Sequence, residues 1–147
     1  MMKELLFNII RKLHLNISIY TEEIFERRCQ EEIIRSDEEQ SSFVYLELNF
    51  DGVKSVLQDE EKVSQFWEVF LLALSRNRGS DIMGFLEREA GIGVLLLDSK
   101  LNGWSRVRGR LEQLAMEYGF DGMSLVLDKS VNPIVYPSCI RDAEQAK

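Results

Sequence analysis

Histidine, cysteine and proline are scarce in this sequence, whose 147 residues include one histidine, two cysteines and two prolines. The single histidine, His14, leaves little room for catalysis that depends on an imidazole. Cys29 and Cys139 lie far apart and belong to no Cys-x-x-Cys or Cys/His pattern, which argues against zinc binding and redox chemistry. The scarcity of proline, with 45% hydrophobic and 29% charged residues, indicates a folded domain and excludes a disordered chain.

An excess of positive charge is also missing. The chain has 18 Lys and Arg against 25 Asp and Glu, a formal net charge of -7. Affinity for nucleic acids and anionic membranes comes largely from clustered Lys and Arg, so we expect no nucleic acid and no membrane partner. A small phosphorylated ligand is still compatible with this charge, because two local arginines can bind it. The segment 1–12 is too short and too charged to cross a membrane, and no cleavage site follows it, which favours a cytoplasmic location.

Helical periodicity dominates the first forty residues. We divide the chain into an N-terminal amphipathic helix over 1–20, one domain over 21–140 and a polar tail over 141–147. The first helix has an apolar stripe that packs on the domain or pairs with a second copy, formed by Leu5, Leu6, Ile9, Ile10 and Leu13. A second helix begins after Thr21, a suitable N-cap, and ends near the polar stretch 35–42.

From residue 43 onward, strand and helix patterns alternate. We predict strands over 43–50, 81–87, 92–98, 123–127 and 134–136, with a hairpin turn over 88–91 and a turn at Asp51-Gly52. One amphipathic helix starts at Asp59, with Val63, Phe66, Trp67, Phe70, Leu71 and Leu74 as its apolar stripe. Another starts after Ser99 and ends at Gly119, with the stripe Trp104, Val107, Leu111, Leu114 and Tyr118. The order predicts an α/β (α+β) fold of ferredoxin-like type, a βαββαβ antiparallel sheet with helices on one or both faces.

The segment around residue 80 narrows the choice among folds of this order. Arg78-Gly79-Ser80-Asp81 leads into a strand, a hairpin and the Leu-rich run over 93–97. This succession resembles the middle of the GGDEF domain, the family of the diguanylate cyclases, in which an R-x-x-D element precedes a strand, the signature turn, a Leu-rich strand and a helix. The resemblance covers roughly residues 21–138 and implies a nucleotide-cyclase-like fold.

The catalytic signature of that family is missing. Aligned on the Leu-rich strand, the signature turn falls near 88–92, where the family's paired glycines are absent. The acidic metal ligands that follow the glycines in the family correspond to Ala90 and Gly91, which carry no carboxylate. The other metal ligand, an aspartate at the end of the first strand, corresponds to Asn49, a poor magnesium ligand. The resemblance therefore implies a degenerate domain with no catalytic residue, no metal site, no cofactor and no cyclase activity.

Two groups of polar residues have more than one interpretation. In the family, the R-x-x-D pair binds cyclic di-GMP, which makes Arg78 and Asp81 the candidate ligand-binding residues; alternatively, Arg78 complements a helix C-terminus and Asp81 caps a turn. Glu47, Asn49 and Asp51 are either a relic metal site or solvent-facing residues of a strand followed by a turn. The arginines at 106, 108 and 110 are interpreted as a solvated helix face, although 106 and 110 share one side.

These patterns predict a non-catalytic GGDEF-like regulatory or protein-interaction domain in bacterial signalling, with cyclic di-GMP as a candidate ligand and a protein or a second copy, in a homodimer, as partner. One alternative is a nucleotide phosphoryl-transfer enzyme with a rearranged metal site that includes Glu47, Asn49, Asp51 and Glu89. Another is an unrelated ferredoxin-like module that senses a small ligand.

Overall fold

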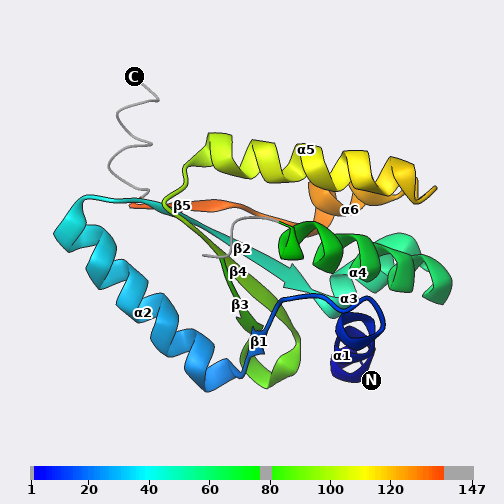
Figure 1. Cartoon of the computed structure of the whole chain (residues 1–147), viewed down its shortest axis with the longest axis horizontal. Helices are drawn as coiled ribbons and strands as arrows, with labels where there is room; N and C mark the ends of the chain where they lie inside the picture. The colour runs from blue at the N-terminus through cyan, green and yellow to red at the C-terminus, as the bar shows by residue number, and fades with distance from the viewer. Residues whose placement is uncertain (1, 77–80, 138–147) are drawn as a thin grey trace.

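The computed structural model describes residues 2–76 and 81–137, which form a five-stranded sheet with helices on both faces (Figure 1). The elements in chain order are α1 (Met2–Lys12), β1 (Ile19–Tyr20), α2 (Glu22–Glu39), β2 (Phe43–Asn49), α3 (Phe50–Leu57), α4 (Glu60–Ser75), β3 (Ile82–Phe85), the 3-10 turn η1 (Glu87–Glu89), β4 (Gly91–Leu97), α5 (Leu101–Glu117), α6 (Met123–Ser130) and β5 (Ile134–Tyr136).

The sheet has the strand order β1-β3-β4-β2-β5. β4 lies between β3 and β2 and is antiparallel to both, with a register that runs from Phe43 opposite Leu97 to Asn49 opposite Gly91 on the β2 side. β5 pairs antiparallel with β2 at one edge, and β1 pairs parallel with β3 at the other. The four strands β3-β4-β2-β5 are antiparallel to their neighbours, and β4 is central, as its continuous apolar run predicts.

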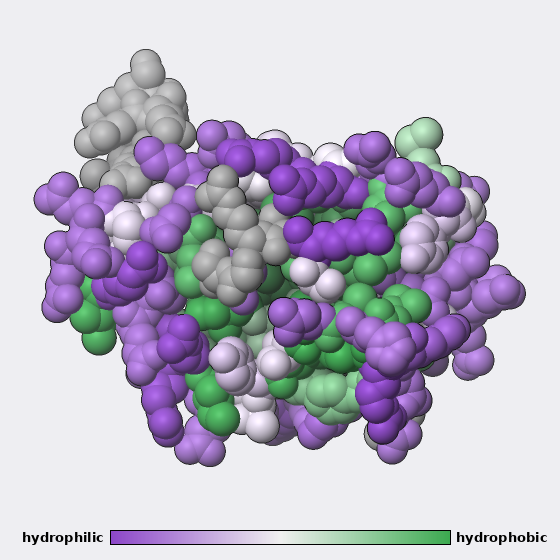
Figure 2. All heavy atoms as spheres, in the orientation of Figure 1, coloured by the Kyte–Doolittle hydropathy of each residue, from purple (hydrophilic) through white to green (hydrophobic). Residues whose placement is uncertain are grey.

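Helices α3 to α6 cover one face of the sheet, and α2 lies on the other (Figure 1). Along β2, the buried side chains of Val44, Leu46 and Leu48 belong to the main core, whereas Tyr45 packs on the α2 side. This alternation follows from the two-residue period of a strand. In the view of Figure 2, hydrophilic residues dominate the outline of the molecule and hydrophobic ones gather toward the middle.

Helix α4 is the helix predicted after Asp59, and its apolar stripe is the centre of the core. The Asp59 carboxylate accepts a hydrogen bond from the Glu61 N–H at 2.9 Å, which caps the helix. All six predicted stripe residues are buried, and the Trp67 ring makes edge contacts with Phe66 and Phe70. Burial of such side chains contributes about 1.5–3 kcal/mol each relative to exposure, so α4 contributes much of the stability of this face.

The apolar stripe of helix α1 packs against the main core of the same chain. Leu6 and Ile9 are buried in the main core, and α1 contacts α4. Of the two roles predicted for this stripe, packing on the domain is therefore the one that the fold contains. Among the described residues, no helix is both long enough and apolar enough to cross a bilayer.

Several local predictions are wrong, each for a physical reason. Residues 123–127 form the start of helix α6 instead of a strand, because Met123, Val126 and Leu127 recur at helical spacing and are all buried. The predicted turn at Asp51-Gly52 lies inside helix α3, which the Asn49 side chain caps. β1, a strand of two residues, was too short to predict, and Tyr118 is 47% exposed at the end of α5.

Candidate functional site

The junction between β2 and α3 lies directly beside the turn between β3 and β4. Asn49, the last residue of β2, is paired with Gly91, and the N–H of Phe50 donates to the carbonyl of Ala90 at 2.9 Å. The amide oxygen of Asn49 accepts a hydrogen bond from the N–H of Gly52 at 3.0 Å, so it serves as the N-cap of α3. Asn49 and the 88–92 turn, the two segments aligned with the family's metal ligands, are thus in contact in the structure.

The β3–β4 turn has a strained backbone. Arg88 has φ 60° and ψ 20°, and Glu89 has φ 54°, so two successive non-glycine residues adopt the left-handed conformation. A Cβ at Gly91 would lie 2.2 Å from the carbonyl oxygen of Leu48, so only glycine fits there. The turn therefore contains a required glycine at 91 and two left-handed positions that glycine would fill without strain.

Both helices that precede the βαββαβ unit hold this turn. The Glu22 carboxylate at the start of α2 accepts a hydrogen bond from the N–H of Arg88 at 2.9 Å. Lys3 of α1 forms an ion pair with Glu89 at 2.9 Å, and its ammonium lies 5.5 Å from the ring centroid of Phe85. The turn is thus fixed from two sides by residues far away in the sequence.

Two acidic residues near this junction have partners of their own. Glu47 accepts a hydrogen bond from the Tyr45 hydroxyl at 2.8 Å, and Glu89 is paired with Lys3. Burial, followed by this bond to Glu47, raises the pKa of Tyr45. Within residues 2–76 and 81–137, no group of three His, Cys, Asp or Glu side chains is arranged to hold a metal ion. The side chains near Asn49 therefore do not fit the divalent metal that the carboxylates of the family bind.

A second candidate site surrounds Asp81, which directly precedes β3. Arg78 lies outside the described residues. The half-buried Asp81 lines a polar cavity of about 300 Å³ together with Ser42 and Ser99. Three basic side chains line the same cavity: Lys100, the N-cap of α5, and Arg106 and Arg110 of the helix itself. Because α5 has 17 residues and its N-terminus faces the cavity, the partial positive charge of the helix end adds to these cations.

The three arginines of α5 divide between two surroundings. Arg106 and Arg110, one helical turn apart, face the Asp81 cavity. Arg108 points elsewhere: its guanidinium bonds to Glu112 at 2.8 Å and to Asp128 at 2.6 Å, which raises the pKa of Arg108. The helical period predicted that Arg106 and Arg110 lie on one side of the helix, but it did not predict that this side lines the cavity with Asp81.

The fold is similar to those of several solved structures. The GGDEF domain of YfiN (TpbB) from Pseudomonas aeruginosa is similar in two solved structures. The structure of a delta-N mutant has a TM-score of 0.53 and 14% identity, and the match covers 82% of this chain and 73% of that chain. The crystal structure of the GGDEF domain has a TM-score of 0.51 and 16% identity, and the match covers 82% of this chain and 78% of that chain. A DGC protein from Thermotoga maritima covers 88% of this chain and 95% of its own, at 12% identity and a TM-score of 0.49. No protein-family model and no curated protein sequence matches the chain.

This chain has the fold of a GGDEF domain. The expected GGDEF-like architecture is confirmed, although the identities of 14% and 16% support the fold alone. The GGDEF-like alignment places Arg88 and Glu89 at the positions of the paired glycines, and these are the two residues with positive φ in the turn. Both are conformations that glycine adopts without strain, held here by residues that carry side chains.

The GGDEF-like site was therefore predictable in part. The structure brings Asn49 and the 88–92 turn together, as the alignment of both with the family's metal ligands implies. The contribution of Lys100, Arg106 and Arg110 to a cavity with Asp81 was missed, because their positions relative to β3 depend on how α5 crosses the sheet. Helical spacing alone could have indicated only the pair 106 and 110.

Proposed function

We propose that this chain is a GGDEF-like domain without cyclase activity that serves as a regulatory module in cyclic-dinucleotide signalling. The observation that carries the proposal is a combination of two sites. The position of the family's strand-end metal ligand holds Asn49, whose side chain caps α3, while Asp81 lines a polar cavity with Arg106 and Arg110.

The first half of the proposal concerns the loss of catalysis. Phosphoryl transfer relies on metal ions for charge stabilisation and for positioning of the nucleophile. At the two positions where the family provides carboxylates, the chain has an amide engaged in a hydrogen bond and the pair Ala90-Gly91. No other carboxylate cluster among the described residues replaces them. We therefore expect no conversion of GTP.

The second half concerns the ligand. Two carboxylates line the cavity, Asp81 and Asp98, and Asp98 is paired with Arg35. A carboxylate such as that of Asp81 can accept from guanine N–H groups, and the three cations of the cavity suit phosphate oxygens. Its volume of about 300 Å³ is at the lower end for small-ligand sites, so it holds part of a dinucleotide while the rest lies outside. Cyclic di-GMP, with guanine and phosphate groups side by side, has the chemistry that these residues recognise.

Titration calorimetry with cyclic di-GMP tests the receptor role. We expect saturable binding that is weakened at least about tenfold by Arg78→Ala, Asp81→Asn or Arg106→Ala, because each removes a charged contact. Arg108→Ala is the matched control, since Arg108 faces Glu112 and Asp128. Absence of heat at high ligand concentration excludes the receptor role and leaves a protein partner or a second copy as the ligand of the domain.

An activity assay tests the other half. The protein is incubated for hours with GTP and magnesium or manganese, and the products are separated by chromatography. We expect GTP to persist unchanged. Any cyclic dinucleotide that forms in proportion to protein concentration refutes the non-catalytic assignment and favours the rearranged metal site.

A further inference from the structure

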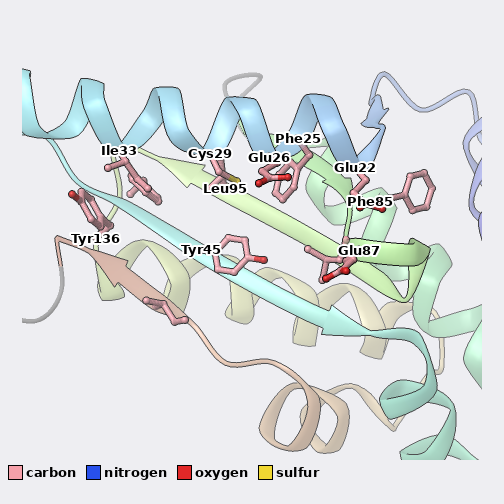
Figure 3. A pocket seen from close by; sticks show the side chains of 13 residues that line it. Glu22, Phe25, Glu26, Cys29, Ile33, Tyr45, Phe85, Glu87, Leu95 and Tyr136 are labelled. Atoms are coloured by element: carbon pink, nitrogen blue, oxygen red, sulfur yellow. The ribbon is translucent and has the colours of Figure 1, made fainter.

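A groove lies under α2, on the face of the sheet opposite the main core, and belongs to neither site described above. Its volume is about 710 Å³, within the range of small-molecule sites. The residues that line it come from α2, the strands β2 to β5 and the start of the β3–β4 turn (Figure 3). Its walls are mainly apolar and aromatic, as in most small-ligand pockets.

Phe25 is the residue of α2 that packs most closely on the sheet beside the groove. A Cβ at Gly84 or at Gly93 would lie 2.3 or 2.5 Å from atoms of Phe25, so this ring sits in a gap made by two paired glycines. Cys29 and Ile33 follow on the same helix face, one and two turns later. Ile33 lines the groove yet is 37% exposed, because no such gap receives it.

Both ends of α2 are tied to the rest of the domain, so the groove is held open as part of the fold. At the N-terminal end, Glu22 accepts the N–H of Arg88. At the C-terminal end, the Tyr136 hydroxyl donates to Asp37 at 3.0 Å, and Arg35 is paired with Asp98 at 3.3 Å. A preformed pocket of this kind does not have to be ordered by its ligand, which favours binding.

Charge distinguishes the two ends of the groove. Glu22, Glu26 and Glu87 lie toward one end, and Ile33 and Tyr136 toward the other, with the Tyr45 ring between them (Figure 3). Among the described residues that line the groove, none is Lys, Arg or His. Glu26 and Glu87 form no ion pair with any described residue. The groove is thus an apolar slot with uncompensated negative charge at one end.

We propose that this groove binds a small organic cation that has an apolar, aromatic body and one amine group. The aromatic body lies between Phe43, Tyr45 and Ile33, and the ammonium group lies between Glu26 and Glu87. Charge complementarity decides this class, because an anion of the same shape meets only carboxylates. The site is separate from the Asp81 cavity, so it stands whether or not that cavity binds a nucleotide.

The test compares three indoles of equal size: tryptamine, which is cationic, tryptophol, which is neutral, and indole-3-propionate, which is anionic. Each is titrated into the ¹⁵N-labelled full chain and followed by ¹H–¹⁵N correlation spectra. We expect tryptamine to shift the amide signals of Cys29, Ile33 and Tyr45 and to bind at least about tenfold more tightly than indole-3-propionate, with tryptophol between them.

Two double variants separate a local charge effect from the overall negative charge. Glu26→Gln with Glu87→Gln should remove most of the preference for tryptamine. Glu23→Gln with Glu31→Gln changes the net charge equally on the outer side of α2, where both residues form exposed ion pairs, and should preserve the preference. Ile33→Trp, at a partly exposed position, should block all three probes by filling the slot.

Three results overturn the proposal. The first is equal binding of the three indoles, and the second is a set of shifts that lies outside the groove. The third is absence of binding at millimolar probe, together with groove signals that change on dilution or on deletion of residues 138–147. That last result assigns the groove to a second copy or to the chain's own tail. Retained native spectra of each variant exclude unfolding as the cause of lost binding.

Discussion

Replacement of Arg88 by glycine should stabilise the protein, because Arg88 holds a left-handed backbone conformation with φ 60° and ψ 20°. For a residue with a Cβ this conformation costs roughly 1–2 kcal/mol. Glycine adopts it freely but loses roughly 0.5–1 kcal/mol more backbone entropy on folding. The difference predicts that Arg88→Gly raises the free energy of unfolding by about 0.5–1 kcal/mol. The hydrogen bond to Glu22 is preserved, since its donor is the backbone N–H.

Two controls isolate the backbone effect. Arg88→Ala retains the Cβ and the strain, so its free energy of unfolding should stay within about 0.5 kcal/mol of the parent. Ala90, two residues later, has φ -78° and ψ -10°, an ordinary right-handed conformation. Ala90→Gly should therefore lower the free energy of unfolding by about 0.5–1 kcal/mol, the opposite sign in the same turn.

Urea unfolding followed by tryptophan fluorescence measures these differences, because Trp67 and Trp104 are both buried. In a thermal melt, 1 kcal/mol corresponds to a shift of about 3 °C for a chain of this length. The reasoning is refuted if Arg88→Gly is no more stable than Arg88→Ala. It is refuted equally if Ala90→Gly gains as much stability as Arg88→Gly, because conformation would then not decide the sign.

Three further predictions concern other parts of the fold. Gly84→Ala places a Cβ 2.3 Å from Phe25 and should lower the free energy of unfolding, measured in urea, by about 1–3 kcal/mol. Phe25→Ala removes the clash, so the double variant should lose less stability than the sum of the two single variants. A loss equal to that sum contradicts this packing. Asn49→Ala should lower the free energy of unfolding by about 1 kcal/mol, whereas Asn49→Asp keeps the cap; restored GTP turnover in Asn49→Asp would show that one carboxylate suffices for catalysis. Burial raises the pKa of Cys29 from 9.0 to about 11, with Glu26 adding to the effect, so in a Cys139→Ser background the alkylation rate of the folded protein should rise until about pH 11. Because the pKa of Cys29 is higher in the folded state, its contribution to the free energy of unfolding is complete below pH 9.0 and is lost as the pH rises through 11. Cys29→Ala should abolish this loss. A plateau in the alkylation rate at pH 9 contradicts the raised pKa.

Long periodic segments were predictable from sequence because their apolar spacing is decided locally. The stripe of α4 from Val63 to Leu74 is buried as its period predicts, and the continuous apolar run of β4 lies at the centre of the sheet. The short segments were not predictable. Residues 123–127 suit a strand by propensity, and the helix α6 forms because Met123, Val126 and Leu127 fill the main core.

The candidate sites follow the same division. By itself the sequence determined the order of the longer elements α4, β4 and α5, the resemblance to a GGDEF domain and the absence of carboxylates at Asn49 and Ala90-Gly91, because each depends on residue type and spacing along the chain. Only the tertiary structure decided that α5 brings Arg106 and Arg110 to Asp81, and that α2 leaves a groove beside Phe25. These juxtapositions join residues far apart in sequence, and they depend on helix crossing and on the gap between two paired glycines, which no local pattern encodes.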